Sequence, residues 1–541
     1  MRALFSAALV AFAAIGAEAA SSFGYKSSSS SWVITTGGGL TVTMTQSTCD
    51  ISSLDLNGNE LQYSSKRTHI NSGLGTVTSS IDTLSDLDDT IQITCEATGI
   101  TQYYLFRSGE NAIYMGTYHT TAADLSELRF LARLDRDVVA AGAVEATYDS
   151  TSDTAIEAED VYSLSNGTTR SKFYSGVPFI DNQVFGVYSK SVDAGVYFVV
   201  SDLGFETSIG GPFWRDINIK VDTATELSFY MNSDHTRTES YRYGFHGPYA
   251  LVFTSGDAPT TSSVDFDFFQ SLDLSGLVIE SGRGQISGSI SDSADVIGSS
   301  DVVVAWSNDA AQYWSSLGAS ATSFKSPLMK PGTYNMTVYK KELAVSRTEV
   351  TVTKGKTTSA TAKVSYTIES DPIWRIGEWD GTPDGFLNAD KIHRAHPSDV
   401  SMSDWEAITF KPGTDDDSDF PMAQFRSVND PITLSFSLTS TQASSDRTLK
   451  IGVSLAQSSG RNSITVNSKY TPSVPASVAV KTRGVTRGVT MGNYKTYTYT
   501  IPSKYLVTGT NTITLTIASG STDPDEEFLH ASVVFDALEL V

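Results

Sequence analysis

The chain has 541 residues, with 61 acidic and 38 basic side chains and a formal charge of -23. A surface this acidic excludes nucleic acid as a partner and favours solubility. The length predicts several domains, because one hydrophobic core rarely grows beyond about 250–300 residues. An acidic polymer would be repelled by the average surface, so a site for one requires a local cluster of Arg and Lys.

The first residues indicate export. Arg2 gives a positive start, residues 3–15 form an apolar run too short to span a bilayer, and residues 17–19 are a small-x-small cleavage site. We therefore predict a signal peptide over residues 1–19 and a secreted, extracellular protein with no membrane partner.

Residues 20–273 contain many short strand-like runs separated by turn residues. Clear examples are 39–45, 90–95, 103–106, 196–201 and 227–231, with a short helical stretch around 265–274. This density of strands predicts one large β-sandwich.

The chain has two cysteines, Cys49 and Cys95. In an oxidising compartment such a pair usually forms a bridge, so we expect one disulfide; two separate buried thiols are the alternative. Asn166 and Asn335 begin glycosylation sequons and are therefore expected at the surface.

Two further strand-rich units follow. Residues 274–366 have the size of a fibronectin type III-like sandwich, and residues 367–541 suit a jelly roll. The predicted class is therefore all-β throughout, in three domains. The first of these two units shows no clustered chemistry in its sequence.

Basic residues gather in the segment 169–174. If it is a strand, Arg170, Lys172 and Tyr174 share one face. The like charge of Arg170 disfavours a second cation, so Lys172 would be prepared to accept a proton near neutral pH. A solvated strand face is the alternative.

A second polar row alternates along residues 235–243. His235, Arg237, Glu239, Tyr241 and Tyr243 would line one face of a strand. Glu239 would orient an arginine or the histidine. A lone histidine is more often structural than catalytic, but its acidic and aromatic neighbours favour a functional role.

A third charged row lies in residues 127–135, where Arg129 and Arg133 would point the same way. The arginine fork suits a uronate carboxylate. The alternative for each is a structural ion pair with Glu127 or Asp135.

Metal motifs are weak. The acidic runs 86–89, 415–419 and 523–527 offer oxygen ligands for calcium, but none has EF-hand spacing, and solvated loops are the simpler interpretation. Structural calcium therefore lacks support from a motif, and we expect no required cofactor and no metal in the site.

The order of these motifs resembles the rhamnogalacturonan lyases of polysaccharide lyase family four, over essentially the whole mature chain. The segments that carry the resemblance are 60–66, 127–130, 169–175, 210–213, 215–218, 231–233, 238–242, 246–249, 308–314, 329–334, 376–381, 396–399 and 483–488. The resemblance implies a catalytic N-terminal β-sandwich, a fibronectin-like middle domain and a carbohydrate-binding-like jelly roll.

The resemblance also implies residue roles. The family's essential lysine and histidine match Lys172 and His235, its substrate-side arginine looks equivalent to Arg129, and further site positions match Tyr230 and Glu239. The implied reaction is endo-acting β-elimination at the rhamnose-α-1,4-galacturonic acid bond of rhamnogalacturonan I, by a protein we expect to be a monomer.

Elementary chemistry agrees with those roles. Arg129, helped by Arg170 or Arg237, would offset the uronate charge, Lys172 would take the C5 proton, and His235 or Tyr230 would support the leaving oxygen. One rival is a glycoside hydrolase that uses carboxylates such as Glu127 and Glu239. The other rival is a polysaccharide-binding protein without catalysis.

Overall fold

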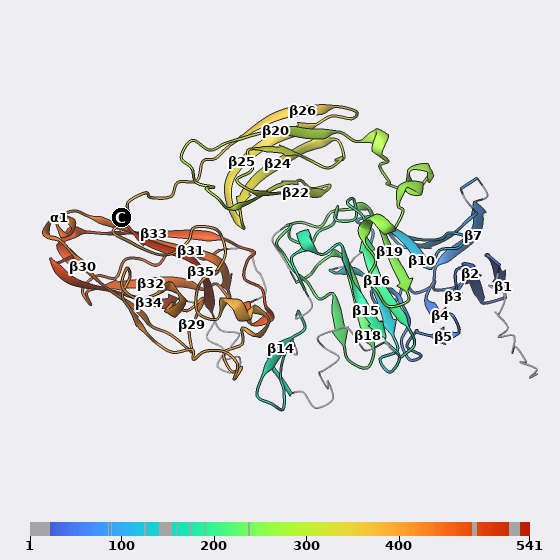
Figure 1. Ribbon diagram of the computed structural model, residues 1–541, viewed down its shortest axis with the longest axis horizontal. Helices are drawn as coiled ribbons and strands as arrows, with labels where there is room; N and C mark the ends of the chain where they lie inside the picture. The colour runs from blue at the N-terminus through green and yellow to red at the C-terminus, as the bar shows by residue number, and fades with distance from the viewer. Residues whose placement is uncertain are drawn as a thin grey trace, which may run out of the picture.

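The structure is a computed structural model that describes residues 22–84, 86–87, 89–123, 126–139, 154–157, 160–173, 176–189, 191–235, 239–478, 484–518 and 531–541. Its strands form three successive units (Figure 1), which we call the sandwich unit, the middle unit and the C-terminal unit. The all-β, three-unit prediction is confirmed. The predicted signal peptide, residues 1–19, lies outside the described part of the chain.

The sandwich unit is built on three sheets. A seven-stranded sheet has the order β15 (Val184–Ser189), β16 (Ala194–Val200), β19 (Gly244–Thr254), β10 (Ala112–His119), β9 (Ile100–Phe106), β8 (Thr90–Ala97) and β7 (Thr78–Leu84). A four-stranded sheet has the order β17 (Ile219–Val221), β18 (Thr225–Asn232), β11 (Leu128–Leu134) and β6 (His69–Ile70). A five-stranded sheet has the order β1 (Gly24–Ser27), β2 (Ser31–Thr35), β3 (Leu40–Thr45), β4 (Ile51–Leu56) and β5 (Asn59–Glu60).

Aromatic rings join the seven-stranded and four-stranded sheets face to face. Phe130 of β11 lies 6.2 Å from Phe198 of β16, and Phe229 of β18 lies 4.4 Å from Tyr249 of β19, between ring centroids. All four side chains are buried. Such pairs add to the free energy of burying their large apolar area, so the sheets form a rigid base for what lies at their edges.

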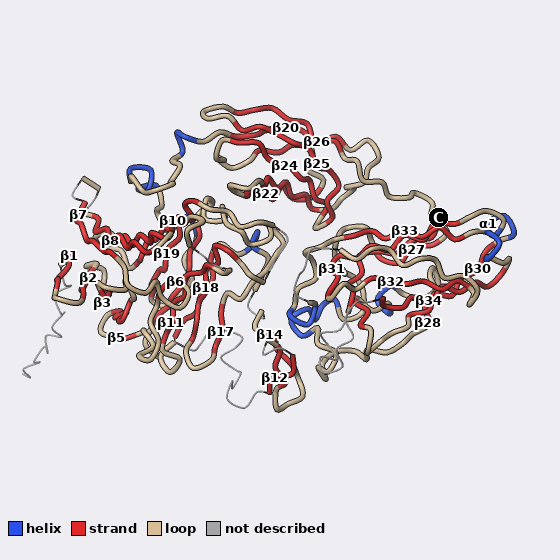
Figure 2. The backbone as a smooth tube through the Cα atoms, turned by 180° about the vertical axis from the view of Figure 1, so that it is seen from behind, coloured by secondary structure: helices blue, strands red, loops and turns tan. Residues whose placement is uncertain are grey.

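A further small sheet projects from the sandwich unit. Strands β12 (Thr154–Glu157), β13 (Val161–Ser163) and β14 (Thr169–Ser171) form a separate sheet, which we call the β12–β14 sheet. It projects from the sandwich unit into the space beside the C-terminal unit, as both views show (Figures 1 and 2). The sheet therefore lies between the sandwich unit and the C-terminal unit.

The predicted disulfide is confirmed. Cys49 and Cys95 are bonded, with 6.4 Å between their Cα atoms, and both are buried. Cys95 lies on β8 as expected, whereas Cys49 follows the end of β3 at Thr45 in a turn with φ 56°. The two sequon residues, Asn166 and Asn335, are exposed.

The middle unit packs two sheets together. One has the order β23 (Ser323–Lys325), β20 (Gln285–Ser291) and β26 (Thr357–Lys363), and the other β22 (Gln312–Ala319), β21 (Asp301–Ser307), β24 (Gly332–Lys340) and β25 (Leu343–Val352). A buried ion cluster fixes this unit to the sandwich unit: Glu206 accepts from Arg283 at 2.5 Å and lies 2.8 Å from Lys330 Nζ. Burial opposes its ionisation, but the two cations hold the pKa of Glu206 below its usual value.

The C-terminal unit is a second sandwich. One sheet contains β27 (Trp374–Gly377), β35 (Ser532–Leu540), β31 (Arg447–Gln457) and β33 (Lys495–Ile501), with β29 (Ala423–Phe425) also paired to β35. The other has the order β28 (Thr409–Phe410), β30 (Ile432–Leu438), β34 (Gly509–Ala518) and β32 (Arg461–Val466). The predicted domain boundaries, after residues 273 and 366, stay predictions.

Helical structure is minor. Where the structure describes the chain, it consists of α1 (Ser440–Ala443) and the short 3-10 turns η2 (Phe179–Asp181), η3 (Thr261–Ser263), η4 (Asp267–Ser271), η5 (Glu280–Gly282), η6 (Ala389–Arg394), η7 (Asp417–Asp419), η8 (Val485–Arg487) and η9 (Ser503–Tyr505). Among the described residues, no helix has the length and apolarity needed to cross a membrane.

Candidate functional site

Arg129 is held at the surface of the four-stranded sheet. It lies directly opposite Tyr230 in the antiparallel register of β11 and β18, and its Nη1 donates to the Tyr230 hydroxyl at 2.8 Å. Its Nε also lies 3.0 Å from Glu127 Oε1. The Arg129 side chain remains 28% exposed, whereas Tyr230 is 2% exposed. The guanidinium is therefore fixed from below and open to a ligand.

His235 lies just beyond the end of β18 and contacts a buried carboxylate. Its Nδ1 is 2.7 Å from Oδ1 of Asp216, which has no exposed surface. Ser233 donates its hydroxyl to the other oxygen of Asp216, and the backbone N–H of Ile217 donates to Oδ1. An ionised carboxylate only accepts, so the imidazole proton lies on Nδ1 and Nε2 is the nitrogen available for proton exchange.

The electrostatics of this first cluster follow from burial and pairing. Burial opposes ionisation of Asp216, but His235 and the hydrogen-bond donors around the carboxylate lower its pKa overall. Burial raises the pKa of Glu127 despite Arg129 and His235 nearby. Burial, reinforced by Asp216, raises the pKa of Tyr230 well above its ordinary value. Tyr230 therefore serves as a neutral hydrogen-bonding group that orients Arg129.

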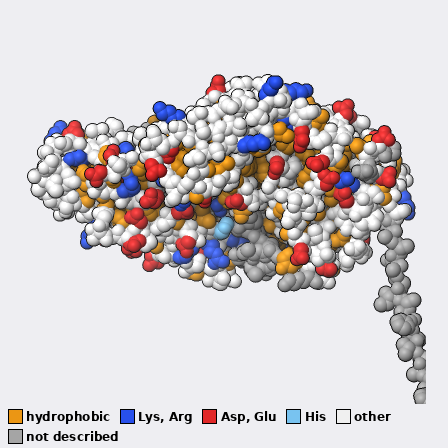
Figure 3. Space-filling view, turned by 45° about the horizontal axis from the view of Figure 1, so that its top comes forward, with side chains coloured by type: hydrophobic (Ala, Val, Ile, Leu, Met, Phe, Trp, Pro, Cys, Tyr) orange, Lys and Arg blue, Asp and Glu red, His pale blue; other side chains and the backbone are white. Residues whose placement is uncertain are grey.

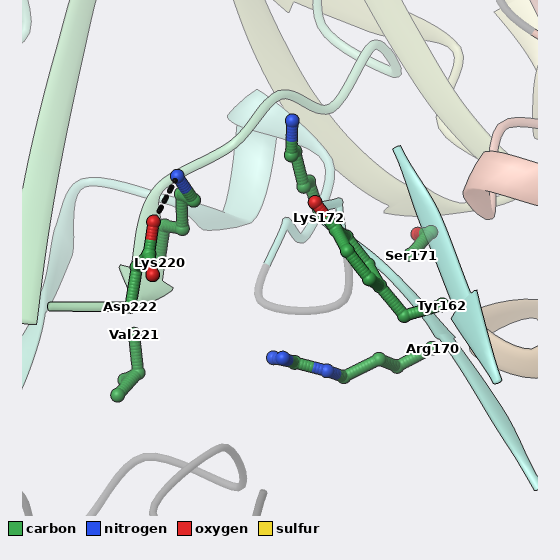
Figure 4. Close-up of a pocket in the computed structure, with 7 residues that line it drawn as sticks. All are labelled: Tyr162, Arg170, Ser171, Lys172, Lys220, Val221 and Asp222. Atoms are coloured by element: carbon green, nitrogen blue, oxygen red, sulfur yellow. Dashed lines mark hydrogen bonds and ion pairs between the residues drawn. The ribbon is translucent and has the colours of Figure 1, made fainter. Parts of the chain in front are cut away.

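Lys172 belongs to a second cluster, at the end of β14. It lines a cavity of about 50 Å³ together with Tyr162, Arg170, Ser171, Lys220, Val221 and Asp222 (Figure 4). Lys172 Nζ lies 3.5 Å from Oδ1 of Asp160, and Lys220 lies 3.2 Å from Asp222. The guanidinium of Arg170 lies over the Tyr162 ring, 5.5 Å from its centroid.

This cavity is basic although the protein is acidic. Three cations, Arg170, Lys172 and Lys220, face one lining carboxylate, Asp222. On the face shown in Figure 3, a few Lys and Arg side chains gather beside a histidine, with Asp and Glu side chains around them. A local positive potential of this kind is what an acidic polysaccharide would need in order to approach.

The two clusters adjoin through one residue. Phe173 follows Lys172 in the chain, is fully buried, and its ring centroid lies 5.1 Å from that of His235. The Tyr230 and His235 rings are 5.8 Å apart. The structure thus brings Arg129, Tyr230 and His235 into contact with one another or with shared partners, and Phe173 connects this group to Lys172, its neighbour in the chain.

Two strand predictions were wrong. β14 ends at Ser171 rather than continuing to residue 174, and the Arg170 and Lys172 side chains extend in different directions (Figure 4). Tyr174 lies outside the described residues. The second row is not a strand either, because β18 ends at Asn232, β19 begins at Gly244, and the described residues between them belong to no strand.

The described side chains between β18 and β19 contact different parts of the molecule. Glu239 accepts the Gly210 N–H at 2.8 Å and lies 2.6 Å from Arg242 Nη2, at a cavity of about 690 Å³ lined by all three units. Tyr241 donates to the Ser126 carbonyl, and the Tyr243 ring packs on His119. Glu239 therefore supports the loop structure, and Arg237 lies outside the described residues.

Arg133 makes structural contacts within the four-stranded sheet. Its Nε lies 3.0 Å from Glu226 and its Nη1 3.1 Å from His69 Nε2, so its partners are on β18 and β6 rather than at Glu127 or Asp135. Arg129 combines both interpretations, since it pairs with Glu127 and remains partly exposed. One β11 face thus carries a structural arginine and an available one.

Asp216 and Asp160 are the polar residues that the sequence pattern did not single out. Asp216 belongs to the segment 215–218, but its separation of 19 positions from His235 hid their contact. The acidic run 415–419 ends in η7, and two of its carboxylates bind backbone groups: Asp415 accepts from the Lys411 N–H and Asp417 from the Gly377 N–H. Of the other two runs, 523–527 lies outside the described residues and 86–89 is described only in part.

Comparison with known proteins identifies the family of this chain. Three family models match in succession: rhamnogalacturonan lyase B, N-terminal, over residues 23–276; polysaccharide lyase family 4, domain II, over 282–360; and polysaccharide lyase family 4, domain III, over 372–540. A solved insecticidal delta-endotoxin of Bacillus thuringiensis is 11% identical, covers 71% of this chain and 51% of its own, and has a TM-score of 0.18, too low to support an argument.

Curated relatives match over nearly the full length. Rhamnogalacturonate lyase A of Aspergillus aculeatus is 44% identical over 547 residues, covering 99% of this chain and 100% of that protein. Rhamnogalacturonate lyase A of Emericella nidulans is 43% identical over 505 residues, covering 93% and 92%. The chain is therefore a polysaccharide lyase and belongs to the rhamnogalacturonan lyases of polysaccharide lyase family 4.

Proposed function

We propose that this lyase is secreted, acts as a monomer without a cofactor, and cuts rhamnogalacturonan I internally at the rhamnose-α-1,4-galacturonic acid bond by β-elimination. The observation that carries the proposal is the pair of adjoining clusters. Arg129 is partly exposed beside the His235–Asp216 pair. Lys172 directly precedes Phe173, whose ring packs on His235.

The proposed chemistry begins at the uronate. The C5 proton lies alpha to a carboxylate and is very weakly acidic until that negative charge is offset. Arg129 is suited to pair with the carboxylate and to stabilise the enolate-like intermediate, since Tyr230 and Glu127 already fix its orientation. The basic cavity that contains Arg170 would draw the acidic chain toward the site.

The remaining steps move one proton each way. Neutral Lys172 takes the C5 proton, the electron pair forms the C4–C5 double bond, and the C4–O4 bond breaks. His235 Nε2 gives its proton to the departing O4, and the Nδ1 hydrogen bond to Asp216 stabilises the charged imidazole before that transfer. Tyr230 is the weaker candidate for this acid, because it is buried and its pKa is well above the ordinary value. The new non-reducing end is an unsaturated galacturonic acid.

The hydrolase alternative finds less support in the geometry. Its two carboxylates would be Glu127 and Glu239, yet Glu127 pairs with Arg129 while Glu239 is engaged by Gly210 and Arg242 at a different cavity. Paired carboxylates flanking one bond are the requirement of that mechanism.

The test is the ultraviolet absorbance of the products. Elimination creates a conjugated double bond, so absorbance should rise in step with new chain ends, whereas new reducing ends without absorbance would refute elimination. Lys172→Ala should lower kcat by about 10³-fold while binding of the polymer is retained. Lys66→Ala, which changes an exposed lysine 4.0 Å from Glu226, is the matched control and should keep parental activity.

A further inference from the structure

The sheet that carries Lys172 is held by the C-terminal unit. Oδ2 of Asp399 accepts two hydrogen bonds from Thr169, the first residue of β14: one from the backbone N–H at 2.6 Å and one from the hydroxyl at 2.9 Å. The Val400 N–H donates to the Gly167 carbonyl at 3.2 Å. These bonds join residues that lie more than two hundred positions apart in the chain, and they fix the start of β14 three residues before Lys172.

Arg487 makes a second and deeper connection. It lies on η8 of the C-terminal unit, is 2% exposed, and points into the β12–β14 sheet. Its Nη1 is 2.8 Å from Oε1 of Glu157, and its Nε is 3.2 Å from Oδ2 of Asp160. His396 approaches the other oxygen of Glu157 at 3.6 Å. One buried guanidinium from a distant unit thus offsets two carboxylates of the projecting sheet.

Asp160 passes this connection on to Lys172. While Oδ2 faces Arg487, its Oδ1 lies 3.5 Å from Lys172 Nζ, and its backbone carbonyl accepts the Lys172 N–H at 2.8 Å. The same residue therefore fixes the Lys172 backbone and faces the Lys172 amine. The charge that Asp160 presents to that amine depends on how much of it Arg487 offsets.

We propose that the C-terminal unit completes the active site: Arg487, through Asp160, and Asp399, through Thr169, are positioning residues for Lys172. This inference rests on the proposed role of Lys172 as the base. It gives the C-terminal unit a function in the reaction itself, separate from any affinity for sugar. The dependence runs both ways, because the buried Glu157 would face a large desolvation cost without Arg487.

The expected direction of the effect follows from the charges around Lys172. Asp160 places a negative charge beside the Lys172 amine, Arg170 and Lys220 add positive charge at the same cavity, and Asp222 offsets Lys220. Tyr162, the other titratable group lining the cavity, lies under Arg170. A base must be neutral to act, so any change that favours the ammonium moves the acid limb of the pH–kcat profile to higher pH.

The experiment measures that limb in the full-length enzyme by product absorbance. Arg487→Gln leaves the Asp160 charge facing Lys172 alone, so the limb should move up by about one pH unit, a roughly tenfold lower kcat at a fixed pH on the limb. Asp160→Asn removes that charge, so the limb should move down. The double variant should match Asp160→Asn, because Arg487 acts on the amine through Asp160. Arg487→Lys should restore most of the parental profile.

A matched control separates positioning from general stability. Arg375 of the C-terminal unit pairs with buried Glu539 at 2.8 Å, far along the chain from the β12–β14 sheet. Arg375→Gln should lower the unfolding temperature without moving the limb. If Arg487→Gln likewise lowers only the unfolding temperature, or if its effect adds to that of Asp160→Asn, the proposal is wrong.

Two further arms keep the result decisive. Should Arg487→Gln fail to fold, the pair Glu157→Gln with Arg487→Met removes both buried charges and should raise the limb in the same way. Lys172→Ala tests the underlying function independently. If that variant stays active, the role of Lys172 as base fails; if it is inactive while the Arg487 and Asp160 variants leave the limb in place, only the positioning role fails.

Discussion

The two clusters of the site are built in opposite ways. Arg129 and His235 are held by the four-stranded sheet. Phe130 and Phe229 of the same sheet are buried in the sandwich core. Lys172 rests on the small β12–β14 sheet, which depends on Arg487 and other residues of the C-terminal unit. One half of the site is therefore held by local packing, and the other half by contacts between units.

This difference separates two kinds of sensitivity. Changes in the sandwich cluster should affect how the carboxylate and the leaving oxygen are handled, with little influence from the other units. Changes in the contacts between the β12–β14 sheet and the C-terminal unit should affect Lys172 alone. Kinetic and stability measurements on single variants can therefore show whether the two halves are independent.

Arg129→Ala should give the largest effect within the sandwich cluster. It removes the group that offsets the uronate charge, so we expect kcat/KM to fall by about 10²–10³-fold, the usual magnitude for one electrostatic stabiliser. Arg129→Lys should recover only part, because an ammonium cannot reproduce the planar fork that also donates to Tyr230. The assay is product absorbance at several polymer concentrations; an unchanged kcat/KM would remove Arg129 from the site.

The sequence predicted this half of the site better than the other. Alternation placed Arg129 on a strand, and the register of β11 with β18 then sets it opposite Tyr230. The pairing itself needs a register shift between Leu128 and Arg129, which alternation alone does not show. His235 was singled out by its polar neighbours, yet its partner Asp216 comes from a separate segment.

The Lys172 half could not be predicted in this way. The pattern of 169–174 favours a longer strand, but β14 ends at Ser171. What determines its position is Asp399, 230 positions from Thr169, and Arg487, 327 positions from Asp160. Contacts over such separations leave no periodic signal, so the sequence showed the basic residues but not the reason for their arrangement.

Removal of the disulfide tests the stability of the sandwich half. The bridge joins residues 46 positions apart, and loss of such a cross-link should lower the free energy of unfolding by roughly 3 kcal/mol. We expect the Cys49→Ser, Cys95→Ser double variant to unfold at a lower denaturant concentration while its pH–kcat profile stays parental at low temperature. A moved acid limb would show that strain in the sandwich reaches Lys172.

Asp216→Asn tests the orientation of His235. The amide keeps the shape but removes the charge that favours the Nδ1 proton and the positively charged imidazole. We expect kcat to fall by roughly 30-fold, with KM changed little, as measured by initial rates of absorbance. The acid limb set by Lys172 should stay in place. If the limb moves as well, the two clusters are electrostatically coupled and the comparison must be revised.

Glu342→Gln gives the smallest effect and probes the junction of the three units. Glu342 precedes β25 at the cavity lined by all three units, its Oε2 is buried without a hydrogen-bond partner among the described residues, and burial raises its pKa to about 8. A carboxyl whose pKa is higher in the folded than in the unfolded protein binds more protons when folded, so stability falls as pH rises from about 4.5 to about 8.

Glutamine removes this proton dependence. The variant and the parent should therefore unfold at similar denaturant concentrations near pH 4.5, while at pH 9 the variant should be the more stable by at least about 1 kcal/mol, allowing for the partial exposure of the side chain. Arg215, which precedes Asp216 in the chain, is the cation that most strongly lowers the pKa of Glu342. A gain in stability without a change in kcat would show that Glu342 acts independently of both clusters. A parallel change in kcat would show that Glu342 affects His235 through Arg215.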